Sequence, residues 1–196
     1  MVGSFGYGRN DSCGAKGGAY GLRPMRVSWL ILGFLLLPSG LWAADWRTGM
    51  LREAGKYVQA WQRSDPRTIV AYLPARVVQQ CGGRDAVLRE LADEIAQARK
   101  LGATELEATL GSPSALRQLG PWMASVLPVT ALLRSTHLEL TQKTHVLVLS
   151  SDRGKRWWFV LLYGVTQAEL NAWFPEFHGR ILVPSTPAPT MKIVYE

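Results

Sequence analysis

The chain has 196 residues, of which 47% are hydrophobic and 19% are charged, a composition that can bury a core and argues against disorder over the whole length. This length suits one domain together with a targeting segment. The formal net charge is +7, but the residues from 44 onward carry 18 Lys and Arg against 14 Asp and Glu, a net charge of +4. The basic residues are dispersed apart from Arg153, Lys155 and Arg156, so no nucleic-acid partner is predicted.

Residues 25–44 are predicted to form an export signal. Arg26 precedes an apolar run from Trp29 to Leu37, and small residues at 43 and 44 follow the helix-breaking segment 38–40. The run is far shorter than the ~20 residues of a transmembrane helix, so we expect cleavage near residue 44 and no membrane span afterwards. An uncleaved anchor is the alternative. This signal would start at Met25 and direct the protein to the periplasm or outside the cell.

Residues 1–24 precede that signal and are Gly-rich without periodicity, so they are predicted to be a non-native or disordered leader. Cys13 lies in this leader, which leaves Cys81 as the single cysteine of the processed chain and excludes an internal disulfide there. Cys81 is interpreted as a buried small apolar residue, with a reactive or dimer-linking thiol as the alternative.

Helical periodicity dominates the first part of the predicted domain, residues 45–178. Apolar residues at intervals of three and four predict a helix over 45–62, with Trp46 and Trp61 in its buried stripe. Asp65 before a proline predicts the cap of a second helix that runs to about residue 73. A third helix is predicted over 84–101, with Leu88, Leu91, Ile95 and Ala98 on its apolar face and Glu94 among the residues off that face.

From residue 104 onward the pattern becomes that of strands. "TELEATLG" alternates, and "WMASVLPVTALLRSTHLELTQ" is β-rich with a bulge or sheet edge expected at Pro128. "KTHVLVLSS" and "KRWWFVLLYG" are predicted to form a hairpin, followed by a short helix over 166–174 and a Pro-rich tail over 179–196 that lies on the surface. The order of elements predicts an α+β fold, with three N-terminal helices packed on a curved, mainly antiparallel sheet and a short C-terminal helix.

The segment Ser150–Trp157 has the spacing Ser-x-Asp-x-Gly-x-x-Trp, formed by Ser150, Asp152, Gly154 and Trp157. It matches the Asp-box consensus of sialidases and other β-propellers, where the box is a structural hairpin away from the catalytic site. A propeller needs several four-stranded blades, which one box in a chain of this length cannot supply. We therefore interpret these residues as a hairpin stabiliser.

The order of elements also resembles the nuclear-transport-factor-2-like superfamily (SnoaL-like, cystatin-like α+β cone), in secreted bacterial members of unknown function. The resemblance covers roughly residues 45–174 and rests on the long helix, "RSDPRTIVAYL", the Gly82-Gly83 lead into a third helix and the hairpin "SSDRG..W". It implies a pocket at the open end of a cone, where enzymatic members such as ketosteroid isomerases and polyketide cyclases place a general base. No catalytic residue of the family matches a position in this chain.

Few residues are candidates for chemistry. His137 and His145, on predicted strands, are weak candidates for a catalytic base. No His and Cys spacing predicts a metal site, and no cofactor is predicted. The candidates for the wall of a ligand pocket are aromatic: Trp61, Tyr72, Trp122, Trp158 and Tyr163.

The strand after the hairpin turn is apolar on both faces. Alternation puts Trp157, Phe159, Leu161 and Tyr163 on one face and Trp158, Val160 and Leu162 on the other. One face takes the helices, so the other needs a cover, which we predict to be a second subunit, with the Pro-rich tail as the rival. The resulting hypothesis is an exported, non-enzymatic protein that binds a small apolar ligand or an envelope protein, and the alternative is a pocket enzyme of the isomerase or cyclase kind with His137 or a buried carboxylate as base.

Overall fold

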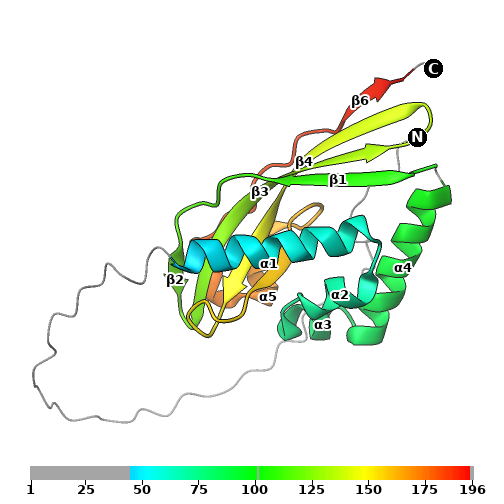
Figure 1. The fold of residues 1–196 in the computed structure, drawn as a ribbon. Helices are drawn as coiled ribbons and strands as arrows, with labels where there is room; N and C mark the ends of the chain where they lie inside the picture. Colours follow the sequence, from blue (N-terminus) through cyan, green and yellow to red (C-terminus); the bar gives the residue numbers. More distant parts are fainter. Residues whose placement is uncertain (1–44, 101, 195–196) are drawn as a thin grey trace, which may run out of the picture.

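Figure 1 shows the computed structural model of the chain, which describes residues 45–100 and 102–194. The predicted leader and export signal lie outside the described residues. Helices pack against a curled antiparallel sheet, so the predicted α+β class is confirmed. No helix in the described part of the chain is long and apolar enough to cross a membrane.

The helices that precede the sheet are α1 (Asp45–Gln62), α2 (Pro66–Ala71), α3 (Ala75–Gln80) and α4 (Arg84–Lys100). The ranges of α1, α2 and α4 agree with the predicted helices. The short helix α3 was not predicted, because six residues are too few to show a helical period. Asp65 caps α2 as predicted: its Oδ1 accepts hydrogen bonds from the backbone N–H groups of Arg67 (3.1 Å) and Thr68 (3.2 Å). Hydrogen bonds from the side chain and backbone of Thr68 lower the pKa of this carboxyl.

The strands are β1 (Glu105–Leu110), β2 (Arg117–Leu119), β3 (Trp122–Arg134), β4 (Leu138–Ser150), β5 (Trp158–Leu161) and β6 (Thr190–Ile193). β3 and β4 form the centre of the sheet and pair along their whole length. β1 and β2 pair with the free edge of β3, while β5 and β6 pair with the free edge of β4. The predicted hairpin of β4 and β5 is confirmed, with Val146 opposite Leu161 and Leu149 opposite Trp158.

The hairpin of β3 and β4, with its turn at residues 135–137, was missed by the sequence analysis. Its turn, Ser-Thr-His, has neither Gly nor Pro, so it lacks the residues that mark a tight turn. Pro128 lies inside β3, opposite His145 of β4. Its carbonyl accepts a hydrogen bond from the N–H of Gly111 (2.8 Å). Its nitrogen, which has no hydrogen to donate, points to the same side, at the gap between the strand pairs that β1 and β2 form with β3. Pro128 therefore lies at a local edge of the sheet, as predicted, although β3 is a central strand.

Hydrophobic side chains cover both faces of the sheet in two clusters. The helix-side cluster joins α1, α2 and α4 to the sheet and includes Met50, Tyr57, Ile69, Leu91, Leu127, Val148, Trp157 and Phe159. The C-terminal cluster lies on the opposite face, where α5 (Gln167–Trp173) and the 3₁₀ turn η1 (Pro175–Phe177) pack. Its members include Leu147, Leu149, Val160, Leu162, Leu170, Trp173, Phe174, Phe177 and Ile181. The predicted alternation of β5 is confirmed, since Phe159 belongs to the first cluster and Val160 to the second.

The second face was the reason to predict a homodimer, and α5 and η1 already cover the part of it formed by Val160 and Leu162. The tail contributes too, because Ile181 is buried and β6 pairs with β4 instead of lying loosely on the surface. The homodimer remains a prediction, and the uncovered apolar face that led to it is smaller than expected.

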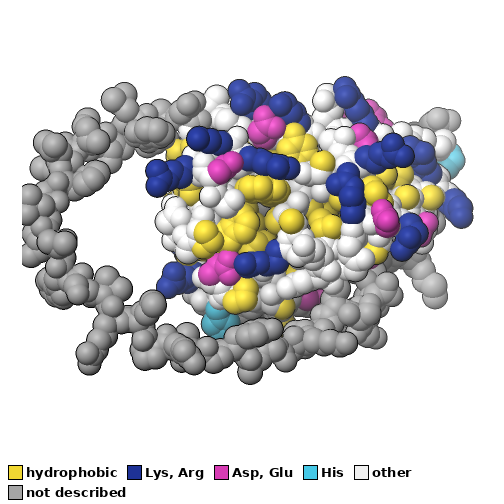
Figure 2. Space-filling model, turned by 90° about the horizontal axis from the view of Figure 1, so that it is seen from below, with side chains coloured by type: hydrophobic (Ala, Val, Ile, Leu, Met, Phe, Trp, Pro, Cys, Tyr) yellow, Lys and Arg dark blue, Asp and Glu magenta, His cyan; other side chains and the backbone are white. Residues whose placement is uncertain are grey.

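Charged side chains are dispersed over the face seen in Figure 2, where Lys and Arg lie among Asp, Glu and hydrophobic residues.

Candidate functional site

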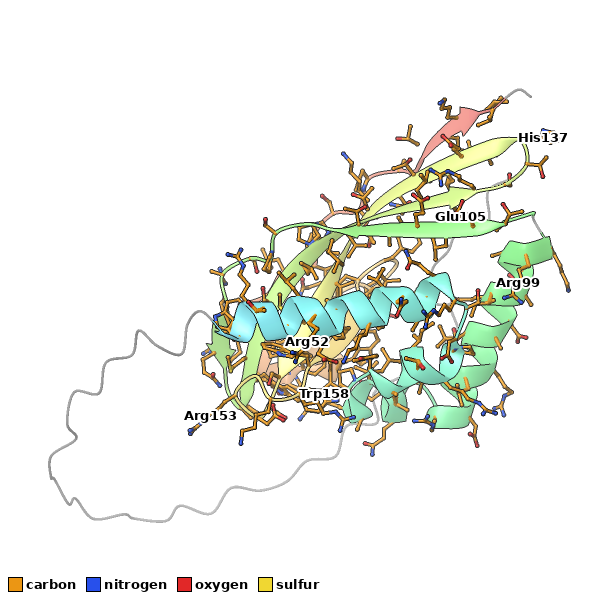
Figure 3. All side chains as sticks on the ribbon, viewed as in Figure 1. Arg52, Arg99, Glu105, His137, Arg153 and Trp158 are labelled. Carbon is orange, nitrogen blue, oxygen red and sulfur yellow. The ribbon has the colours of Figure 1, made fainter. Side chains whose placement is uncertain are left out.

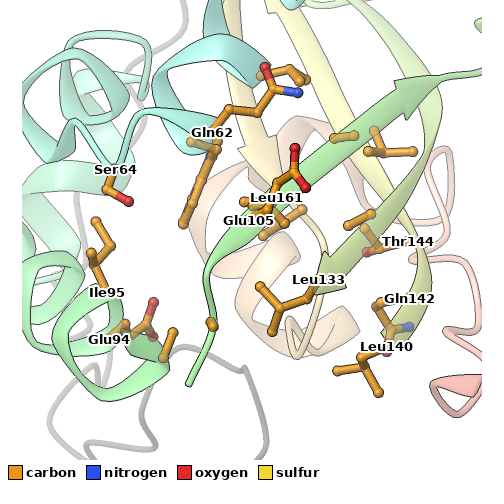
Figure 4. Close-up of a pocket in the computed structure, with 18 of the residues that line it drawn as sticks. Gln62, Ser64, Glu94, Ile95, Glu105, Leu133, Leu140, Gln142, Thr144 and Leu161 are labelled. Carbon is orange, nitrogen blue, oxygen red and sulfur yellow. The ribbon is translucent and has the colours of Figure 1, made fainter. Parts of the chain in front are cut away.

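A cavity of ≈ 340 Å³ lies between the C-terminal half of α4, the end of α1 and the sheet. Small-molecule sites in proteins span about 300–1,000 Å³, so this volume suits a small ligand. Figure 4 shows Glu94 and Ile95 on α4, facing Leu133 and Leu140 of the sheet across the space. Most of the wall is apolar or aromatic: Tyr57, Val58, Trp61, Ile95, Ala98, Ala103, Leu106, Ala108, Val129, Ala131, Leu133, Leu140, Val146, Leu161, Tyr163 and Pro189.

Three small side chains on different elements leave room in the cavity. Ala98 on α4, Ala108 on β1 and Ala131 on β3 all line it, and Ala108 lies opposite Ala131 in the sheet. Helix α4 packs on α2 and α3, and its buried residues Val87 and Leu91 lie in its first half. The second half of α4 therefore borders the cavity without filling it.

Glu94 is the polar group that distinguishes this wall. Burial, together with a smaller effect of the nearby Glu90, raises the pKa of its carboxyl from 4.5 to about 7. No described residue donates a hydrogen bond to this carboxyl or forms an ion pair with it, and its oxygens are not fully buried. A carboxyl with a pKa near 7 can take up or release a proton under ordinary conditions.

Two buried polar atoms of the wall, Thr144 Oγ1 and Trp61 Nε1, have no hydrogen-bond partner among the described residues. The side chain of Thr144 lines the cavity from β4 and is 6% exposed. A buried hydroxyl of this kind costs free energy unless something in the cavity bonds to it.

The other charged groups around the cavity are at its rim. Arg63 and Arg99 are exposed, and Glu105 is exposed and paired with Arg134 (3.2 Å). Figure 3 shows Arg99 on α4 and Glu105 on β1 at the same end of the molecule. Arg134 also pairs with Glu107 and with Glu139 (3.3 Å), so this guanidinium is already surrounded by carboxylates.

Tyr57 is the buried aromatic residue at the floor of the cavity. It is 2% exposed and stacks on Phe159 with ring centroids 5.2 Å apart. Burial raises the pKa of its hydroxyl to about 12, an effect that the neighbouring Trp61 partly opposes. Tyr57 is therefore a neutral, structural part of the wall at ordinary pH.

Of the five predicted pocket residues, Trp61 and Tyr163 line the cavity. Tyr72 lies in the core beneath it, edge-on to Tyr57 (6.0 Å between centroids). Trp122 and Trp158 contact each other on the opposite face, at a centroid distance of 5.9 Å, beside the C-terminal cluster.

These three residues have partners of their own. The Tyr72 hydroxyl donates to Glu53 (3.0 Å) and the Trp122 indole N–H donates to Glu176 (2.6 Å). The guanidinium of Arg156 lies 5.3 Å from the ring centre of Trp158. None of Tyr72, Trp122 and Trp158 lines the cavity.

Neither histidine candidate borders the cavity. His137 is exposed at the tip of the β3–β4 hairpin (Figure 3). His145 lies between Thr144 and Val146, whose side chains line the cavity, so alternation directs His145 to the other face of the sheet.

The sequence analysis placed Glu94 off the apolar face of this helix, and the structure corrects this, because Glu94 lines the cavity together with Ile95 and Ala98. Glu94 is three residues after Leu91 and four before Ala98, which places it within the apolar stripe of α4. An acidic residue inside such a stripe is a sign of a polar group directed to the interior.

The hairpin segment is a structural element at the end of the sheet. The Ser150 hydroxyl donates to Asp152 Oδ1 (2.9 Å) and accepts from the N–H of Gly154 (2.8 Å), while Asp152 Oδ1 also accepts from the N–H of Arg156 (2.9 Å). Burial opposes ionisation of Asp152, but these hydrogen bonds together lower the pKa of its carboxyl. Gly154 has φ +84°, and a Cβ there would lie 3.3 Å from the buried ring of Trp157. This geometry agrees with the interpretation as a turn stabiliser.

A second hollow, ≈ 420 Å³, lies among Glu53, Tyr72 and residues 155–157. Its carboxylate is already satisfied, since Glu53 accepts from Tyr72 and from Lys56 (2.9 Å). Among the described residues no group of three or more His, Cys, Asp and Glu could hold a metal ion.

Comparison of the chain with protein-family models, with curated proteins and with solved structures finds no match in any of the three.

Proposed function

We propose that this chain is an exported, non-enzymatic protein that binds a small apolar molecule in the cavity between α4 and the sheet. The observation that carries the proposal is the cavity itself, ≈ 340 Å³ with a mainly apolar and aromatic wall. Export is proposed from the signal pattern in residues 25–44. The resemblance of the sequence to the nuclear-transport-factor-2-like cone would imply a pocket at the open end of the cone.

The test is to fill the cavity from one side. Ala98 lines it from α4, whereas Ala96 is exposed on the same helix and does not. Ala98→Phe is expected to weaken binding of the uncharged fluorescent probe N-phenylnaphthylamine by about tenfold or more, because the new ring occupies the space of the probe. Ala96→Phe makes the same change of residue outside the cavity and should bind as the wild type does. Equal affinities for the two variants, or no binding by the wild type, would contradict the proposal.

A second candidate is an enzyme that moves a proton next to a carbonyl group, and Glu94 is the observation that favours it. A carboxyl with a pKa of about 7 in an apolar wall is suited to act as general base. No hydrogen bond joins Glu94 to a tyrosine among the described residues, so the paired base and donor of such a site are not seen, and this candidate stays second to simple binding. Isomerisation of a β,γ-unsaturated ketone that Glu94→Gln abolishes would favour this candidate over simple binding.

A further inference from the structure

We infer that the cavity selects apolar molecules that carry one protonated amine, which pairs with Glu94. This inference rests on the proposed function, because it specifies the ligand of the same cavity.

The first argument is that the Glu94 carboxyl has no partner among the described residues. Glu94 is part of the cavity wall and faces Leu133 across the space, yet no described residue donates to it or pairs with it (Figure 4). A partly buried carboxylate without a partner is unfavourable, and a protonated amine in the cavity would supply both the charge and the donors.

The second argument is the arrangement of charges that face Glu94. Glu90, on the same helix, repels it, and Glu105 on β1 is a further carboxylate at the rim. The cations that line the cavity, Arg63 and Arg99, are exposed at the rim and form no ion pair with Glu94. The interior of the cavity therefore favours a cation, and an anionic head group would meet a carboxylate as soon as it left the rim.

The third argument is Thr144, whose Oγ1 is buried and unsatisfied on the sheet side of the same cavity. The hydroxyl can both donate and accept a hydrogen bond, so it can accept one from an amine, and the wall holds more polar capacity than the described chain uses. A molecule that is apolar along most of its length and polar at one end suits such a wall.

The test compares three probes of equal chain length: octylamine, octanol and octanoate, each displacing N-phenylnaphthylamine from the full chain below its micelle concentration. We expect octylamine to bind about tenfold more tightly than octanol, and octanoate to bind more weakly than both. Glu94→Gln should bring the ratio of amine to alcohol affinity close to one. Asp93→Asn removes the same charge from an exposed neighbour on α4 and should keep the wild-type ratio.

The pH dependence of octylamine affinity separates a binding role of Glu94 from a purely structural role, which would not make the affinity for the amine depend on pH. Glu94 ionises near pH 7, so octylamine should bind about tenfold more tightly at pH 8 than at pH 6, while octanol should not change. Octanol binding as tightly as octylamine, or an amine preference that survives Glu94→Gln, would overturn this inference and leave the proposed function standing. Failure of all three probes and of N-phenylnaphthylamine to bind would overturn the proposed function.

Discussion

Replacing Glu94 by glutamine is expected to stabilise the fold above neutral pH. In the folded state the pKa of this carboxyl is about 7, against 4.5 for the ordinary group. Between these values the unfolded chain has released a proton that the folded chain still holds, so the free energy of unfolding falls as pH rises from about 4.5 through about 7. Above that range the loss is complete, because both states are ionised.

The size of the effect follows from the shift. One pKa unit corresponds to about 1.4 kcal/mol, so the whole shift would amount to about 3 kcal/mol. Glu94 is only partly buried, and solvent screening reduces this to about 1–2 kcal/mol. Glu94→Gln removes the ionisation and should raise the melting temperature at pH 8 by about 2–8 °C.

The assay is urea unfolding of the wild type and the variant at intervals from pH 5 to pH 8. The wild type should lose stability across this range, and Glu94→Gln should lose less of it. Asp93→Asn, the exposed neighbour, should follow the wild type. If the two variants have the same pH dependence, the reasoning that places an unpaired carboxyl on the cavity wall is refuted.

Three further substitutions test the structural account. Asp152→Ala should lower the free energy of unfolding by about 1–2 kcal/mol, because it removes two hydrogen bonds of 2.9 Å in the β4–β5 turn, and the exposed Ser151→Ala should change it by less than about 0.5 kcal/mol in the same urea titration. Thr166→Ala removes the capping box of α5 and should cost about 1 kcal/mol by thermal unfolding, a loss that Thr166→Ser should largely restore. Phe177→Ala should cost about 3–5 kcal/mol, and a loss below about 1 kcal/mol would mean that η1 does not cover the sheet in solution.

Helices α1, α2, α4 and α5 and the hairpin of β4 and β5 could be predicted because their signals are local. Asp65 before Pro66 marks the start of α2, and the box from Ser150 to Trp157 marks a turn whose hydrogen bonds all lie within it. Such signals depend on backbone chemistry that holds in any fold.

Long-range pairings left less trace in the sequence. β6 is short and exposed at every residue, so it lacks the alternation of buried and exposed residues that predicts a strand. Its partner in β4 lies about fifty residues earlier in the chain. The cover of the second face was likewise unpredictable in detail, because Phe177 lies after the predicted helix over 166–174 and no local signal assigned it to the core.

The cavity was the least accessible feature. Aromatic residues were expected to line it, and two of the five do, but the space itself comes from alanines at positions 98, 108 and 131 on three different elements. A small residue carries no signal for a cavity until the elements around it are arranged. Glu94 was predicted to lie off the apolar face of α4, and only the structure shows that it borders the cavity beside Ile95 and Ala98.

The most direct test of the binding cavity is to map the residues that a bound apolar molecule labels. An octylamine derivative bearing an aryl diazirine can be bound to the full chain, photolysed and located by peptide mass mapping. We predict labelling of α4 around Ile95 and Ala98 and of β3 around Leu133, the two walls of the cavity. Labelling concentrated on the face of Trp122 and Trp158, or spread evenly over the surface, would contradict a binding cavity between α4 and the sheet.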